Sequence, residues 1–182
     1  MKRLETDRLI LRQWSEADSK DLYEYAKNEL VGPNCGWTTH KNEEESKEVI
    51  KRVIKNDDTL AIVLKSENKV IGSIGLHDRK PDASLSNLKQ KEIGYALNPK
   101  YWGQAFVPEA VKCLIDYGFN ELNLDLIWCG HYDFNHNSRR VNEKCGFNYR
   151  FQRKKKLELF DNKEVTILYY SIFKSEFLNS IC

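Results

Sequence analysis

The sequence predicts an α+β protein in three layers (α/β/α), with a mixed, mostly antiparallel central sheet of about seven strands and helices on both of its faces. Two observations support this prediction. Apolar stripes at helical spacing alternate along the chain with short apolar runs that end at turn residues. The order of the expected elements, β-α-α-β-β-β-α-β-α-β-β, is typical of an α+β fold with a mixed sheet.

The first half of the chain is expected to hold two helices between strands. Ser15 with Asp18 has the pattern of a capped helix start, and this helix should run to Asn28. Asn42 can cap a second helix, whose acidic first turn, Glu43–Glu45, suits the positive end of the helix dipole. The other expected elements are strands at Leu9–Arg12, Leu60–Leu64 and Val70–Leu76, and a loop at Val31–Trp37.

The second half is expected to alternate strands and helices and to close in a hairpin. A strand over Glu92–Leu97 should end at Asn98-Pro99, because the residue before a proline avoids the helical conformation. A helix begins at about Phe106, and Gly146 can cap a later short helix. The remaining elements are a strand at Leu126–Tyr132, a helix at Ser138–Lys144, and hairpin strands at Phe147–Phe160 and Glu164–Phe173.

Length and charge narrow the class of protein. A chain of 182 residues is expected to form one domain over residues 1–182. Its 29 Lys and Arg residues against 27 Asp and Glu leave a net charge of +2, which does not point to a nucleic-acid or membrane partner. No apolar run reaches the ~18 residues of a membrane span. The charged start Met1–Arg8 lacks the apolar region of a signal peptide, so a cytoplasmic location is expected.

The cysteines predict neither a disulfide framework nor a metal site. They are odd in number and lack CxxC spacing, so reduced thiols are expected at Cys35, Cys113, Cys129, Cys145 and Cys182. Cys129, His131 and His136 have the residue types of a metal site. No fourth ligand accompanies them, and no metal is expected.

The turn Lys100–Ala105 leads directly from a strand into an amphipathic helix. Such a helix start leaves N–H groups without intrahelical partners, and with the dipole they suit a pyrophosphate. Gly103 and the small Ala105 would let phosphates approach the backbone, and Pro108 is compatible with a first helical turn. From the turn alone, an ordinary strand–turn–helix connection is the favoured interpretation. Neither GxxxxGK[ST] nor GxGxxG occurs, which argues against a P-loop and a dinucleotide fold.

Lys100–Ala105 also resembles the [QR]-x-x-G-x-[GA] acetyl-CoA loop of the GNAT N-acetyltransferase superfamily, with Lys100 in place of the usual Gln or Arg. Further segments are similar to the branch that acetylates ribosomal-protein N-termini. These are Glu5–Arg12, Glu92–Tyr95, Pro108–Ala110, Asn135–Ser138 and Glu143–Phe147. They occur in the right order and span nearly the whole chain.

The resemblance implies a set of contacts with acetyl-CoA. The strand Ile93–Leu97 should splay from a parallel neighbour, Ile127–Tyr132. The backbone should hold the pantetheine arm at Tyr95, Ala96 and Leu97, and the pyrophosphate at Trp102, Gly103, Gln104, Ala105, Phe106 and Val107. Asn135 should bond the pantetheine amides, and Ser138 should lie near the cofactor sulfur.

The resemblance also implies direct attack of an amine on the thioester in a ternary complex. Glu92 is the candidate base, acting through water, although Lys89 and Lys91 nearby can equally make it a plain surface carboxylate. Ser138 is the candidate acid, or else a helix N-cap or first-turn hydroxyl. Many members of the superfamily place a tyrosine acid where this chain has Asn142, a departure that shifts weight to Ser138 or solvent.

Other residues concern the acceptor. Trp37, His40 and Tyr132 are candidates to line its pocket, with simple packing as the alternative. His77 can be a second base or a hydrogen-bonded strand end. The basic run Arg150–Lys156 can attract RNA, but such runs are usually solvated strand faces, so nucleic acid is not an expected partner.

The predicted function is therefore transfer of acetyl from acetyl-CoA to a primary amine, with a protein N-terminus as the acceptor. Alternatives are acetylation of a small-molecule amine, such as an antibiotic or polyamine, and a non-catalytic acyl-CoA-binding module supported by Asn142. The expected state is a monomer or homodimer without metal or membrane partners.

Overall fold

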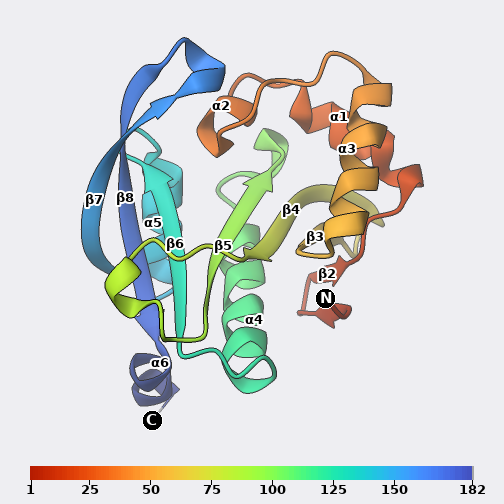
Figure 1. The fold of residues 1–182 in the computed structure, drawn as a ribbon. Helices are drawn as coiled ribbons and strands as arrows, with labels where there is room; N and C mark the ends of the chain where they lie inside the picture. The colour runs from red at the N-terminus through yellow and green to blue at the C-terminus, as the bar shows by residue number, and fades with distance from the viewer. Residues whose placement is uncertain (182) are drawn as a thin grey trace. The chain divides into compact units, whose positions relative to one another are not determined.

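The computed structural model describes residues 1–181, so the thiol expected at Cys182 lies outside the described residues (Figure 1). Among them, eight strands follow the sheet order β1-β2-β3-β4-β5-β6-β8-β7. β5 (Gln90–Leu97) and β6 (Leu126–Tyr132) form a parallel pair, and the other described registers are antiparallel. The α+β class and the mixed sheet are confirmed. The sequence predicted seven strands rather than eight. The strand that it missed is β1 (Leu4–Glu5), whose two residues are too few to show an alternating pattern.

The backbone divides into two units, which are described separately. The first comprises Met1–Gly75 and Tyr95–Ala110, and the second comprises Leu76–Gly94 and the chain from Val111 onward. The expectation of a single domain stays a prediction. Three elements cross the boundary between the units, namely β4 (Lys69–His77), β5 and α4 (Phe106–Asn120).

In the first unit, two helices pack side by side over an apolar core (Figure 1). The elements are β2 (Leu9–Arg12), η1 (Glu16–Asp18), α1 (Ser19–Ala26), α2 (Gly32–Cys35), α3 (Glu43–Asn56), β3 (Thr59–Leu64) and η3 (Pro99–Tyr101). The core includes Trp14, Tyr25 and Ile50. Asn42 caps α3 as expected, with its side-chain oxygen accepting the Glu45 N–H at 2.8 Å.

Two expectations about the first unit need correction. Ser15 and Asp18 do form a reciprocal capping box, but it starts the short 3-10 turn η1, and α1 ends at Ala26 rather than Asn28. The segment expected as a loop at Val31–Trp37 contains the helical turn α2. Pro33 sits near its start, where the missing N–H costs nothing, and Gly36 ends it in the left-handed region at φ 83°.

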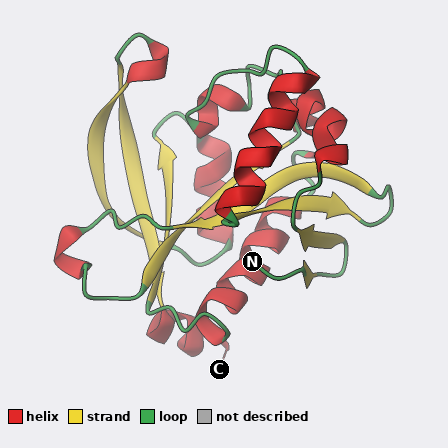
Figure 2. Cartoon of the chain, turned by 45° about the vertical axis from the view of Figure 1, so that its right-hand side comes forward, coloured by secondary structure: helices red, strands yellow, loops and turns green. Residues whose placement is uncertain are grey.

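The second unit is built on the long antiparallel hairpin of β7 (Asn148–Leu157) and β8 (Lys163–Phe173), with β6 beside β8. Figure 2 shows this hairpin extending to a short helix at its tip, η4 (Glu158–Phe160). The other elements are η2 (Ala83–Leu85), α5 (His136–Lys144) and α6 (Lys174–Ile181). Part of the basic run in β7 is neutralised, because Arg150 pairs with Glu176 at 2.7 Å and Lys154 with Glu164 at 2.8 Å.

Three elements of the second unit differ from expectation. β7 ends at Leu157 instead of Phe160, because the next three residues form the short helix η4. After η4 come two residues in the left-handed region, Asp161 at φ 51° and Asn162 at φ 56°. α5 begins at His136, two residues before the expected Ser138. The helix α6 was not predicted, since it follows β8 without a break or a capping signal.

Candidate functional site

The turn from β5 into α4 lies in the first unit and is held by its own side chains. Asn98 accepts the Lys100 N–H with its side-chain oxygen at 3.1 Å, which caps η3. The indole Nε1 of Trp102 reaches back to donate to the Leu97 carbonyl at 3.0 Å. These contacts fix the turn that leads to Gly103, three residues before the start of α4 at Phe106.

Two residues of this turn occupy the left-handed region. Gly103 has φ 78° and Ala105 has φ 61°. Glycine adopts this region freely, whereas an alanine there costs about 1 kcal/mol. A side chain built at Gly103 would meet nothing within 4 Å, so the space beside this residue is open.

The N–H groups at the start of α4 form a set of unpaired donors. The first intrahelical bond runs from the Glu109 N–H to the Ala105 carbonyl at 3.2 Å, which leaves the Phe106 and Val107 N–H groups without a partner inside the helix. Among the described residues of the first unit, none accepts a hydrogen bond from the N–H groups of residues 103–107. α4 is 15 residues long, and its dipole adds positive potential here. This donor set fits a diphosphate group.

Glu24 of α1 anchors the other side of the turn. Its carboxylate accepts from Lys100 Nζ at 2.8 Å, Lys69 Nζ at 2.5 Å and Asn98 Nδ2 at 3.1 Å. The hydrogen bond from Lys100, followed by that from Lys69, lowers the pKa of Glu24 to about 2. Lys100, which stands where the GNAT loop usually has Gln or Arg, thus ties the turn to α1.

The end of β5, expected to hold the pantetheine arm, already makes contacts inside the first unit. The Tyr95 carbonyl accepts from the Cys35 thiol at 3.6 Å, and the Leu97 carbonyl accepts from Trp102. The Ala96 carbonyl lies 2.4 Å from the place a side chain would take at Gly72, so only a glycine allows this approach. The carbonyls of Tyr95 and Leu97, two of the residues whose backbone is expected to hold the pantetheine arm, therefore have protein partners.

Glu92 is the candidate base, and it lies in the second unit on the parallel stretch of β5. Its register partner in β6 is Trp128, and the residue is only 9% exposed. Burial raises the pKa of its carboxyl, and the positive charges of Arg79 and His77 and a hydrogen bond from the Gly130 N–H oppose this rise. Glu92 is therefore a buried carboxylate, and the alternative of a plain surface carboxylate is wrong.

The two lysines near Glu92 in the sequence make their contacts elsewhere. Lys89 Nζ donates to the Leu122 carbonyl at 2.6 Å, and Lys91 Nζ lies 3.8 Å from Asp78. The cation at Glu92 is instead Arg79, whose Nη1 lies 3.7 Å from Oε2 of the carboxylate.

Two glycines leave room around Glu92. A side chain at Gly130 would lie 3.1 Å from Glu92 Oε1 and 3.3 Å from the Tyr169 ring. A side chain at Gly94, two residues along the same face of β5, would lie 3.0 Å from His77 Nε2. Arg79 and Tyr169 were not predicted, because nothing local in the sequence connects them to Glu92. His77, weighed as a second base, does belong to this cluster.

α5 positions two further candidates. Asn135 is the N-cap, and its side-chain oxygen accepts the Ser138 N–H at 3.1 Å. Ser138 is half-buried and lies in the first turn of α5. Of the two structural roles considered for it, N-cap and first-turn hydroxyl, the second is therefore the one observed. Asn142, at the usual tyrosine position, is fully buried and donates to the Cys129 carbonyl at 3.4 Å. It ties α5 to β6.

The candidate acceptor residues fall into both units. In the first, the rings of Trp37 and His40 lie 5.2 Å apart, and Trp37 packs against the apolar core. His40 is buried, its Nδ1 is 2.8 Å from the Ser46 hydroxyl, and burial lowers its pKa. In the second, Tyr132 stacks on Phe134 at 5.3 Å.

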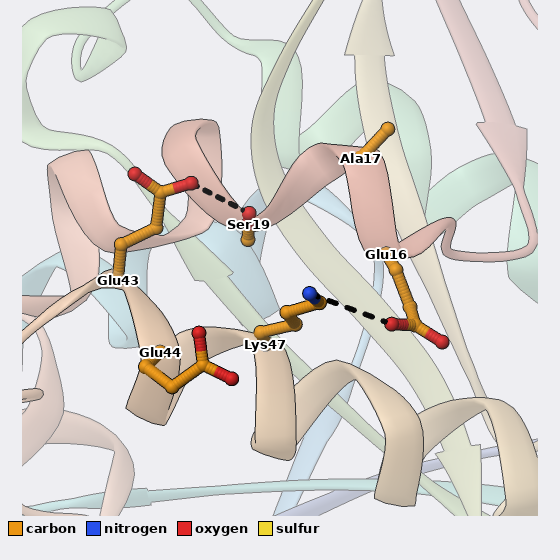
Figure 3. Close-up of a pocket in the computed structure, with 6 residues that line it drawn as sticks. All are labelled: Glu16, Ala17, Ser19, Glu43, Glu44 and Lys47. Atoms are coloured by element: carbon orange, nitrogen blue, oxygen red, sulfur yellow. Dashed lines mark hydrogen bonds and ion pairs between the residues drawn. The ribbon is translucent and has the colours of Figure 1, made fainter.

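A cavity of about 490 Å³ lies in the first unit, where α1 and α3 begin. Figure 3 shows the Glu43 carboxylate accepting from the Ser19 hydroxyl (2.8 Å) and Lys47 facing Glu16 (4.0 Å). The lining residues are Glu16, Ala17, Ser19, Glu43, Glu44 and Lys47. None of them was a predicted site residue. The acidic first turn of α3 was the only feature noted in the sequence that lies at this cavity.

Three further observations concern residues 1–181. Cys35, Cys113, Cys129 and Cys145 are not joined in disulfides. No three His, Cys, Asp or Glu side chains in this range gather as metal ligands would. None of its helices has the length and apolar character that crossing a bilayer requires.

Comparison with known proteins gives consistent matches. Residues 8–148 match the family described as "Acetyltransferase (GNAT) domain". The uncharacterized N-acetyltransferase YoaA of Bacillus subtilis (strain 168) is 30% identical over 149 residues, which are 79% of this chain and 81% of that protein. A GNAT-family acetyltransferase from Bacillus anthracis superposes with a TM-score of 0.85 at 25% identity, covering 96% of this chain and 100% of the other. The ribosomal-protein-S5-alanine acetyltransferase of Vibrio fischeri shares the fold, with a TM-score of 0.75 at 21% identity over 97% and 98% of the two chains.

Proposed function

Since the chain belongs to the acetyltransferase (GNAT) domain family, we propose that it transfers the acetyl group of acetyl-CoA to the α-amine of a protein N-terminus. The observation that carries this proposal is the set of unpaired N–H groups at residues 103–107. They are backbone donors at the positive end of a helix, which is the chemistry a diphosphate requires. Bound acetyl-CoA would supply a thioester whose carbonyl carbon an amine can attack.

Glu92 is proposed as the base that removes a proton from the incoming amine, through a water molecule. A base works best when its pKa approaches the working pH, and burial moves the pKa of Glu92 in that direction. The nearby charge of Arg79 opposes the rise of this pKa and favours the ionised form that a base requires. The Gly130 N–H donates to the carboxylate, and His77 lies 3.0 Å from the place a side chain would take at Gly94, so a backbone donor and an imidazole lie close to the proposed base.

Ser138 is proposed to stabilise or protonate the leaving thiolate with its hydroxyl. Its backbone N–H is already used by the Asn135 cap, which fixes the first turn of α5 while leaving the hydroxyl to act separately. Asn142 cannot take this role, since it is fully buried. Asn135, whose side-chain oxygen accepts the Ser138 N–H, is proposed to bond the pantetheine amides.

The choice of a protein N-terminus rests on the segments similar to the ribosomal-protein branch and on the shared fold with the Vibrio fischeri enzyme. Trp37 and His40 in the first unit, and Tyr132 in the second, are each proposed as contacts of the acceptor.

The test is amine-dependent release of free CoA thiol from acetyl-CoA, measured over peptides with Ala, Ser or Met N-termini, lysine, polyamines and aminoglycosides. We expect saturable turnover with one class of peptide N-terminus. Turnover with small amines alone would overturn the choice of acceptor. Binding of acetyl-CoA without turnover of any amine would instead support a non-catalytic acyl-CoA-binding module, and no binding at all would overturn the proposed function.

A further inference from the structure

Arg8 directly precedes β2 and contacts the loop Gly103–Phe106, which is proposed to bind the diphosphate. Its Nη1 donates to the Gln104 carbonyl at 3.0 Å, and its Nε donates to Glu109 Oε2 at 2.7 Å. Its guanidinium carbon lies 4.4 Å from the centre of the Phe106 ring. One side chain thus holds the loop, the first residue of α4 and the first turn of that helix.

The hydrogen bond from Arg8 to the Gln104 carbonyl also fixes the orientation of a neighbouring donor, the Ala105 N–H. The Gln104 carbonyl and the Ala105 N–H belong to one planar peptide group, and in a trans peptide they point in opposite directions. The described chain has no cis peptide. When Arg8 holds the Gln104 carbonyl, the Ala105 N–H must therefore point away from Arg8, and within the first unit no described residue accepts a hydrogen bond from it.

The same contacts hold Ala105 in its unfavourable conformation. Its φ of 61° is rare for a residue with a side chain. Such a conformation persists only where the surroundings fix it. Here both adjoining peptides are fixed, since Gln104 is bonded by Arg8 and the Ala105 carbonyl accepts the Glu109 N–H at 3.2 Å.

Glu109 is itself held by the segment that carries Arg8. The Arg8 backbone N–H donates to Glu109 Oε1 at 3.0 Å, and the Thr6 hydroxyl donates to the same oxygen. These bonds connect the Glu5–Arg12 segment to the Pro108–Ala110 segment, although Arg8 and Glu109 are 101 residues apart in the sequence.

We infer that Arg8 is a positioning residue for the diphosphate site: it sets the loop Gly103–Phe106 in its donor-out conformation before acetyl-CoA binds. This inference rests on the proposed function. Arg8 does so through its planar fork, which bonds a carbonyl and a carboxylate at the same time. A lysine at this position would keep the charge, but its single nitrogen cannot span both acceptors in this arrangement.

The test compares R8Q and R8K with the matched variant R12Q. Arg12, four residues along the same segment, makes an equally close pair with Asp18, at 2.8 Å for both nitrogens, and does not contact the loop. The dissociation constant of CoA is measured by calorimetry, and the unfolding temperature is measured beside it. Crystal structures of ligand-free wild type and R8Q give φ of residue 105.

We expect R8Q and R8K to weaken CoA binding about tenfold, and R12Q to leave it unchanged while lowering the unfolding temperature. Ala105 should leave the left-handed region in R8Q. Wild-type affinity in R8Q or R8K, or equal weakening in R12Q, would overturn the inference. If wild type itself does not bind CoA, the proposed function fails, and the conformation of Ala105 in R8Q still decides whether Arg8 positions the loop.

Discussion

The carboxylate of Glu92 lies 3.7 Å from the guanidinium of Arg79, yet 12% of the glutamate side chain and 64% of the arginine side chain are exposed. Burial raises the pKa of Glu92, and the charge of Arg79 is the largest influence that lowers it. Burial and an arginine that is mostly in solvent thus shift the ionisation of this carboxyl in opposite directions, and burial has the larger effect. This arrangement gives two predictions, one for a variant of Glu92 and one for a variant of Arg79.

E92Q should lose activity and gain stability. We expect kcat to fall about 100-fold, because the base is gone. A glutamate whose pKa is raised by folding stabilises the fold below its ordinary pKa of 4.5 and loses that contribution as pH rises. E92Q should therefore unfold at a higher temperature than wild type at pH 8, with a smaller difference at pH 4. Kinetics and thermal unfolding at both pH values check this. A stable variant with full kcat would remove Glu92 from the mechanism.

R79Q should move the acidic limb of the pH–rate profile to higher pH. Without the arginine charge, the pKa of Glu92 rises further, so a higher pH is needed to ionise it. The measurement is kcat/KM from pH 5 to 9. K91Q is the control, because Lys91 pairs with Asp78 and its profile should match wild type. An unshifted R79Q profile would show that Glu92 is not the titrating group.

G103D should weaken acetyl-CoA binding strongly. The new carboxylate would enter the open space beside Gly103 and repel the diphosphate. Gly146 provides a matched control, because it also has positive φ, 79°, and also has nothing within 4 Å of a new side chain. G146D should carry the same backbone strain, about 1 kcal/mol, and keep wild-type affinity. Calorimetry with CoA distinguishes them, and equal affinities of the two variants would contradict the proposed site.

E24Q should destabilise the fold by about 1 kcal/mol at pH 7. The pKa of Glu24 is lowered to about 2, so its stabilising contribution is present above pH 4.5 and is lost as pH falls toward 2. The difference in unfolding free energy between wild type and E24Q should therefore shrink over that range. Urea unfolding of wild type and E24Q from pH 2 to 7 measures it. A difference that does not change with pH would mean that the two lysines do not act through the carboxylate charge.

Features set by neighbouring residues were predictable from the sequence. The capping box of Ser15 and Asp18 and the cap by Asn42 need only residues three positions apart. The start of α4 at Phe106 follows from its apolar spacing. In contrast, α6 carries no such local signal, and the position of η4 depends on the left-handed pair Asp161 and Asn162.

The candidate site was predictable only in part, because its properties come from contacts distant in the sequence. Glu92 was identified as a candidate base, but its burial depends on Gly130 and Tyr169, which lie far along the chain. The loop Lys100–Ala105 was identified from its motif. Its support by Arg8 was not, since no pattern within either segment shows that they meet.

The most direct test of the account is a crystal structure of the protein with acetyl-CoA bound. We predict diphosphate oxygens within hydrogen-bond distance of the N–H groups of residues 103–107, with Arg8 still bonded to the Gln104 carbonyl. Acetyl-CoA bound elsewhere, or these N–H groups bonded to the protein itself, would contradict it.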